Sequence, residues 1–112
     1  MRNQLLSGKH ADYYEAIIHV RPKNVEVHNF IRENVARRND CRISKEDVLK
    51  TGIDFYLTSQ RYAVALGKKL REKFKGKTLI TRQLYSVNRN TSRKVYRVTV
   101  LFRLPDKEEQ II

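Results

Sequence analysis

The chain has 112 residues, which is room for one compact domain and too short for a two-domain enzyme, since domains usually hold about 100 to 200 residues. Hydrophobic residues make up 40% of the sequence and charged residues 32%, so the chain can build a core and is not disordered throughout. The 24 Lys and Arg against 12 Asp and Glu leave a formal net charge of +12, which indicates a polyanionic partner.

The sequence contains no run of about eighteen apolar residues that could span a membrane, and residues 1–30 lack the apolar centre of an export signal. We therefore expect a cytoplasmic protein. A single cysteine, Cys41, excludes an internal disulfide and a metal site built from several thiolates of one chain. Gly76-Lys77-Thr78 lacks the upstream glycine of a phosphate-binding loop. The sequence thus predicts no cofactor, no metal, no membrane contact and no small-molecule substrate.

The positive charge is concentrated in one block of the chain. Between Arg61 and Arg103 there are 13 basic residues and one acid, Glu72, whereas residues 1–60 carry 10 basic and 8 acidic residues. Clustered Lys and Arg neutralise phosphates and release counterions, although such a cluster can also be a solvated face that keeps a protein soluble. We favour a surface that contacts a polyanion over a solvated face, because this block holds the whole excess of positive charge of the chain.

In chain order, residues 1–11 are polar and aperiodic, which is typical of a flexible N-terminal tail. A strand is predicted over residues 13–21, where side chains alternate until Pro22 ends the pattern. The alternation divides it into a core set, Tyr14, Ala16, Ile18 and Val20, and an outer set, Tyr13, Glu15, Ile17, His19 and Arg21.

A first helix is predicted over residues 24–38, with Asn24 as its N-cap. Its apolar stripe has helical spacing and consists of Val27, Phe30, Ile31 and Val35. Residues 42–50 are ambiguous, because Ser44-Lys45-Glu46-Asp47 resembles a helix start while the position between two elements suits a short edge strand. We favour the edge strand.

A further strand is predicted over residues 53–57, and Ser59 then caps a second helix. Gly76 lies where a left-handed residue ends a helix. The apolar stripe of this helix consists of Tyr62, Ala63, Leu66, Leu70 and Phe74.

The last third of the chain predicts a hairpin, with strands over residues 78–87 and 95–104 around a polar turn. Residues 105–112 form an acidic tail, so the domain covers residues 12–104. The second strand divides into a core set, Tyr96, Val98, Val100, Phe102 and Leu104, and an outer set, Val95, Arg97, Thr99, Leu101 and Arg103.

The predicted order is strand, helix, strand, strand, helix, strand, strand. Two helices that each bury one stripe can cover one face of a four or five stranded, mainly antiparallel sheet, which gives an α+β two-layer sandwich. The other sheet face is then open, and the alternation assigns His19, Arg21, Arg97 and Arg103 to it, together with Ile17, Val95 and Leu101.

Nothing in the sequence supports an enzyme. Cys41 has no histidine placed beside it, which favours a partly buried structural thiol over a nucleophile. Asp54 could cap a helix, pair with an arginine or serve a site, and we favour a structural role because no second carboxylate is paired with it.

Two basic features remain as candidate RNA contacts, one on the second helix and one on the hairpin. Together with the cations of the open face, the predicted RNA-binding residues are Arg61, Lys68, Lys69, Arg71, Lys73, Lys75, Lys77, Arg82, Arg89, Arg93, Lys94, Arg97, Arg103, His19 and Arg21.

Three segments carry a resemblance to a known family: Tyr13-Tyr14-Glu15-Ala16-Ile17-Ile18-His19-Val20-Arg21, Gly52-Ile53-Asp54-Phe55-Tyr56-Leu57-Thr58-Ser59 with Ala63, and Val95-Tyr96-Arg97. Over residues 12–104 the chain resembles a middle section of the Nmd-three family, the archaeal and eukaryotic adaptors of the large ribosomal subunit. Family members usually carry Cys-x-x-Cys zinc motifs before the first strand, where this chain has Gly8-Lys9-His10, so zinc binding does not carry over. They also continue into further domains, which makes this chain either an excised domain or a small stand-alone relative, archaeal in style.

The resemblance implies binding to the large ribosomal subunit or its precursor, through rRNA and a ribosomal protein, during ribosome biogenesis. Together with the charge block it predicts a non-catalytic rRNA-binding module that contacts the phosphate backbone through a basic helix and hairpin. The alternative is a protein-interaction module that docks through Ile17, Val95 and Leu101 of the open sheet face.

Overall fold

The computed structural model describes residues 13–88 and 93–105, with side chains described for residues 13–84 and 96–105. The predicted N-terminal tail and all but Pro105 of the predicted acidic tail lie outside these ranges. The elements are β2 (Ala16–Arg21), α1 (Val25–Ala36), β3 (Ile43–Val48), β4 (Ile53–Leu57), α2 (Gln60–Phe74), β5 (Lys77–Asn88) and β6 (Arg93–Arg103). The predicted order is confirmed, and residues 43–48 form the strand that we favoured over a helix.

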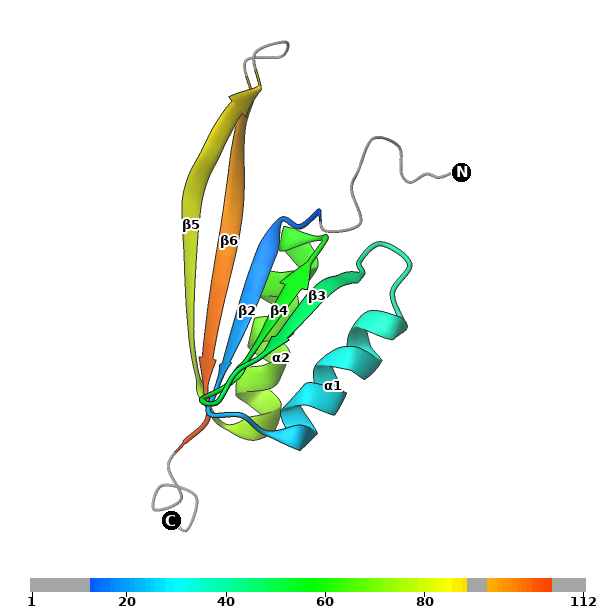
Figure 1. Ribbon diagram of the computed structural model, residues 1–112, viewed down its shortest axis with the longest axis vertical. Helices are drawn as coiled ribbons and strands as arrows, with labels where there is room; N and C mark the ends of the chain where they lie inside the picture. The colour runs from blue at the N-terminus through cyan, green and yellow to red at the C-terminus, as the bar shows by residue number, and fades with distance from the viewer. Residues whose placement is uncertain (1–12, 89–92, 106–112) are drawn as a thin grey trace.

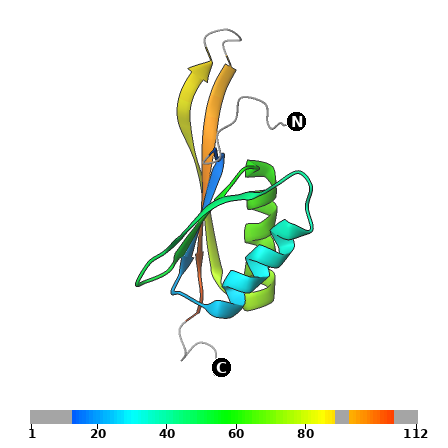
Figure 2. The ribbon, with the colours of Figure 1, turned by 45° about the vertical axis from the view of Figure 1, so that its right-hand side comes forward.

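The strands form one five-stranded sheet in the order β3-β4-β2-β6-β5 (Figure 1). β2 runs parallel to β6, while the other neighbouring pairs are antiparallel. Both helices cover the same face of the sheet, and the other face is open (Figure 2). The two-layer α+β sandwich and the mainly antiparallel sheet are therefore confirmed.

The core lies between the helices and the covered sheet face. Ile18 of β2 stands opposite Phe55 of β4 and Val100 of β6, and all three side chains are fully buried. Directly opposite residues share one face of a sheet, so this register aligns the apolar sets of the three central strands. Across from them lie the buried residues of α1 and α2: Val27, Ile31, Val35, Tyr62, Ala63, Leu66 and Leu70.

The predicted N-caps of both helices are confirmed, whereas the residue predicted to end α2 is not the one that does so. The side chains of Asn24 and Ser59 accept hydrogen bonds from the backbone N–H of Val27 at 3.0 Å and of Tyr62 at 3.2 Å, as predicted. The left-handed residue at the end of α2 is Lys75, with φ of 59°, and not Gly76.

Gly76 is required for a different reason. A Cβ at this position would lie 2.4 Å from the carbonyl oxygen of Arg103 and 2.6 Å from the ring of Phe102. The backbone of β6 cannot move away without breaking its pairing, so a glycine is needed for close approach between the start of β5 and the end of β6.

Two tyrosines were predicted to face the core, and neither is buried in it. The chain bends at Glu15 before β2 begins at Ala16, so the alternation does not extend back to Tyr14. The Tyr14 ring makes an edge contact with Tyr56, at 4.9 Å between centroids, on the open face. Tyr96 lies on the same face of β6 as the buried Val98, but it is 40% exposed, where β6 no longer pairs with β2.

The β5–β6 hairpin is longer than the rest of the sheet. β2 pairs with β6 only from Val98 to Arg103, so the pairing from Gln83 with Arg97 to Asn88 with Arg93 forms a two-stranded arm (Figure 1). The register of the arm shifts between Leu84 and Ser86. A two-stranded ribbon has little core of its own, so the body of the domain anchors this arm.

Candidate nucleic-acid interface

Four cations form a stripe along one flank of α2. Arg61, Lys68, Arg71 and Lys75 follow one another at spacings of seven, three and four residues, which places them on the same side of a helix. All four are exposed. Thr78 of β5 donates a hydrogen bond to the carbonyl oxygen of Gly67, at 3.2 Å, so this flank of α2 lies beside β5.

One cation of β5 extends the stripe onto the sheet. Arg82 stands opposite Val98, whose side chain is buried beneath the helices, so Arg82 lies on the helix side of the sheet. It is exposed because β5 is the edge strand and α2 does not reach over it. We call the five residues together the α2 surface: Arg61, Lys68, Arg71, Lys75 and Arg82.

No ion pair joins a carboxylate to a cation of the α2 surface within the part of the chain that the structure describes. The ion pairs found there join residues between His19 and Asp54, and none includes a cation of the α2 surface. Glu72, the acid of the same helix, is exposed and takes part in none of these pairs. The surface therefore keeps a net positive charge, although Glu72 lies on the same helix and Asp40 lies near Arg61, and such a surface attracts a polyanion.

Two further predicted contacts of α2 lie on its other flank. The Lys73 ammonium is 5.5 Å from the ring centroid of Phe30 in α1 and 5.8 Å from that of Phe74. It therefore belongs to the contact between the helices, where cation–π attraction holds it. Lys69 is exposed.

On the open face, His19 and Arg21 are already engaged. The Arg21 guanidinium lies 2.9 Å and the His19 Nδ1 2.8 Å from the carboxylate of Asp54, which is 8% exposed. This arrangement agrees with the structural role favoured for Asp54. A phosphate would have to compete with that carboxylate for either side chain.

The remaining cations of the open face differ in their surroundings. The Arg97 guanidinium lies 4.0 Å from the ring centroid of Tyr14 and donates a hydrogen bond to its hydroxyl at 3.0 Å. Lys77 and Arg103 stand opposite each other at the body end of the hairpin, and both are exposed. The predicted contacts at the hairpin tip lie outside the described side chains: Arg89, Arg93 and Lys94.

The family model described as NMD3, second domain, matches residues 13–104, which is most of the chain. The chain belongs to the NMD3 family. This family is associated with function at the large ribosomal subunit. No curated protein matches the chain.

The fold of this NMD3-family domain places one further arginine, which sequence reasoning missed, beside the α2 surface. The Arg38 guanidinium lies 4.6 Å from the ring centroid of Tyr62, in the first turn of α2, next to Arg61. The hydrogen bond from Arg38 is the main cause that lowers the pKa of Asp40, and the charge of Arg61 adds to it. The end of α1 and the start of α2 thus form one basic corner.

The sequence held a signal for this corner, since Arg37, Arg38 and Arg42 follow closely on one another. Counting charge by segments concealed it, because the acids elsewhere in residues 1–60 balanced these arginines in the sum. Only the fold places Arg38 at the first turn of α2, where the block that begins at Arg61 starts.

Metal-ligating clusters and long apolar helices are absent from the described part of this NMD3-family domain. No group of three or more His, Cys, Asp or Glu side chains there is arranged to hold a metal ion. No helix in the same ranges is long and apolar enough to cross a membrane. Cys41 is buried, and burial raises the pKa of its thiol, as suits a structural cysteine.

Proposed function

We propose that the domain is a non-catalytic binding module for rRNA in the large ribosomal subunit or its precursor, acting in ribosome maturation. The α2 surface contacts the phosphate backbone, and the basic hairpin extends the contact. Family membership supports the association with the ribosome, and the proposal adds the RNA and the surface that binds it.

The observation that carries the proposal is the absence of carboxylate partners for the α2 surface among the described residues. Exposed cations that repel one another lower the stability of a fold, and a polyanion removes that repulsion on binding. Arg61 and Lys75 are separated by a length of helix of about 20 Å, at about 1.5 Å per residue, which is enough to meet several phosphates.

The test is a filter-binding titration of rRNA fragments at several salt concentrations. Neutralising about four phosphates predicts a slope of log affinity against log salt of roughly −3 to −4. The double variant Lys68→Ala, Arg71→Ala should make that slope shallower by about 1.5 and weaken binding at low salt about tenfold or more. The melting temperature should stay unchanged, because both side chains are exposed.

The matched control is Lys23→Ala, Lys50→Ala, which also removes two exposed charges, but at the opposite end of α1 and in the β3–β4 turn. It should leave the slope close to that of the parent. Equal losses in both double variants would mean that net charge alone drives binding, and no affinity at low salt would refute the proposal.

A second candidate is docking of a protein partner on the open sheet face. Leu79 is 60% exposed and stands opposite Leu101, so a small apolar patch lies among the cations of β5 and β6. Capture of partners with and without nuclease separates the candidates, because nuclease should release partners held through RNA and leave those held by Leu79.

A further inference from the structure

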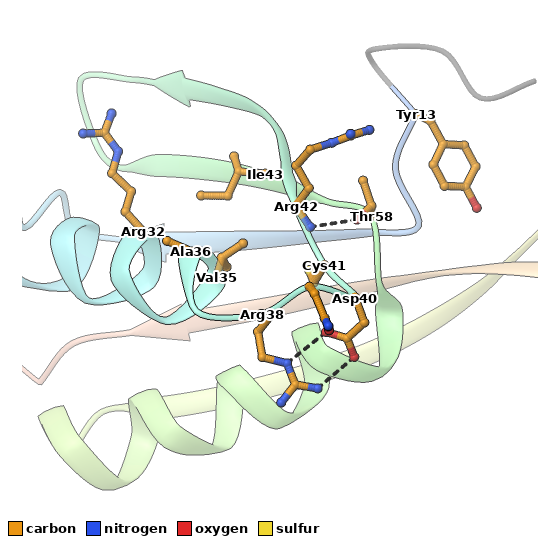
Figure 3. Close-up of a pocket in the computed structure, with 11 residues that line it drawn as sticks. Tyr13, Arg32, Val35, Ala36, Arg38, Asp40, Cys41, Arg42, Ile43 and Thr58 are labelled. Atoms are coloured by element: carbon orange, nitrogen blue, oxygen red, sulfur yellow. Dashed lines mark hydrogen bonds and ion pairs between the residues drawn. The ribbon is translucent and has the colours of Figure 1, made fainter. Parts of the chain in front are cut away.

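A pocket of about 620 Å³ opens between the end of α1, the start of β3 and the residues that join β4 to α2 (Figure 3). Its apolar wall is formed by Val35, Ala36, Cys41 and Ile43, and Tyr13 lines it from the segment before β2. Burial, together with a hydrogen bond donated to Glu15, raises the pKa of Tyr13 to about 12, so this phenol is neutral at physiological pH. The volume lies within the range of about 300 to 1,000 Å³ that small ligands occupy.

Three arginines line the same pocket, and two of them are held in place. Arg32 donates to both carboxylate oxygens of Glu46 at 2.7 and 2.8 Å, and Arg38 donates to both of Asp40 at 2.8 and 2.9 Å. Two parallel hydrogen bonds fix the plane of each guanidinium group. Arg42 is exposed and belongs to none of the ion pairs of the described residues, so its charge is available to a ligand.

We propose that this pocket holds one unpaired nucleotide of single-stranded RNA, with its base against the apolar wall and its phosphate at Arg42. The inference rests on the proposed function and deepens it, because it adds a site that reads a base to a surface that contacts phosphates. Unstacked bases in RNA loops are typically held against aromatic rings and arginine planes, and this pocket offers both in Tyr13 and Arg38.

The position of the pocket fits a strand that also contacts the α2 surface. Arg38 joins the two, since it lines the pocket and lies against Tyr62 in the first turn of α2, next to Arg61. A chain of phosphates along the stripe therefore reaches the pocket at the N-terminal end of α2.

The polar group at the edge of the pocket predicts a preference among bases. Asp40 is exposed, and its hydrogen bond from Arg38 lowers its pKa, so the carboxylate is ionised and only accepts hydrogen bonds. An acceptor suits the exocyclic amino groups of adenine, cytosine and guanine, and uracil has no such group. The pocket should therefore prefer adenine or cytosine to uracil.

The test uses fluorescence anisotropy with labelled ten-nucleotide strands of A, C and U, an abasic strand of equal charge, and an RNA duplex. The parent should bind the A or C strand at least about fivefold more tightly than the U and abasic strands. Ala36→Trp should remove that advantage and leave duplex binding unchanged. Ala36 is exposed at the end of α1, so a larger side chain fills the pocket without displacing buried neighbours.

Two further variants keep the test informative. Asn29→Trp places the same side chain at an exposed position of α1 outside this pocket and should change no affinity. Arg42→Ala leaves the apolar wall intact and should weaken binding of the A or C strand about fivefold, with the duplex affected less. If Ala36→Trp lowers the melting temperature, Arg42→Ala is used in its place to test the pocket.

The outcomes separate the two proposals. If base-bearing and abasic strands bind equally and with the same dependence on salt, the nucleotide site in the pocket is refuted and the proposed function still holds. No binding of any strand or of the duplex overturns both. The nucleotide site is also refuted if Ala36→Trp binds every RNA like the parent but no longer captures a protein that the parent retains after nuclease treatment. The pocket then binds a protein partner.

Discussion

The cations of residues 19–54 and those of the α2 surface have the same chemistry and different neighbours. In the first region His19 and Arg21 share Asp54, and His28 and Arg32 share Glu46. No cation of the α2 surface forms an ion pair with a carboxylate among the described residues. A count of charges therefore does not distinguish cations that stabilise the fold through ion pairs from cations that are available to a partner.

The distinction has a physical basis in burial. Asp54 and Glu46 have side chains that are 12% and 19% exposed, so each needs partners to offset the loss of water. The cations of the α2 surface keep their hydration, and their mutual repulsion is the only cost of leaving them unpaired. Removing a charge should therefore reduce stability in the first region and RNA affinity in the second.

The largest expected effect comes from breaking the most buried pair. Asp54→Ala should lower the free energy of unfolding by about 2 to 3 kcal/mol, because Arg21, only 25% exposed, loses its carboxylate. Urea unfolding at neutral pH measures the change. Adding Arg21→Met should restore part of the loss, since an apolar side chain needs no counter-charge.

A neighbouring acid provides the control for that result. Asp47 stands opposite Asp54 in the sheet but is 36% exposed, and its pair with Lys45 is 3.7 Å long. Asp47→Ala should cost less than about 0.5 kcal/mol. A similar loss in both variants would show that strand propensity, and not the buried pair, governs the result.

The fold followed from the sequence wherever one local rule decided the outcome. Alternation in β2 and β6, helical spacing in α1 and α2, and the N-caps Asn24 and Ser59 each predicted a feature that the structure contains. The strand order did not follow, because only tertiary packing selects β6 as the parallel neighbour of β2.

The errors lie where tertiary structure overrides a local pattern. Tyr14 lies on the open face because the chain bends at Glu15, and Glu15 accepts a hydrogen bond from the backbone N–H of Gln60 at 3.1 Å. No periodicity could show that contact across 45 residues. For the candidate site, sequence reasoning predicted the cations of α2 as RNA contacts but did not divide them between two flanks. It also missed Arg38, whose place beside Tyr62 depends on how the two helices pack.

A smaller effect, with a pH signature, is expected at Glu46. The hydrogen bond from Arg32 is the main cause that lowers the pKa of this carboxyl, and it outweighs the opposing effect of burial. A lowered pKa in the folded state contributes stability above the ordinary carboxyl range, and the contribution is lost as the pH falls through the folded value. Glu46→Gln should thus cost about 1 kcal/mol at pH 7.

Urea unfolding of this variant and its parent as a function of pH provides the measurement. The difference between them should narrow as the pH falls below about 4, where the parent carboxylate becomes protonated. A difference that stays constant from neutral to acid pH would mean that the introduced amide disturbs packing, and that the ion pairs of Glu46 with Arg32 and His28 contribute nothing.

The smallest effect on stability is expected from Asp40→Asn, which turns the paired cation Arg38 into an unpaired one. Arg38 and Asp40 have side chains 46% and 51% exposed, so Asp40→Asn should leave the free energy of unfolding almost unchanged. It frees Arg38 beside Arg61, and one more phosphate contact should steepen the salt slope for an RNA duplex by about 0.9. Asp47→Asn frees Lys45 on the open face instead and should leave the slope unchanged. Equal slopes in both variants would mean that the corner between α1 and α2 is not part of the RNA surface.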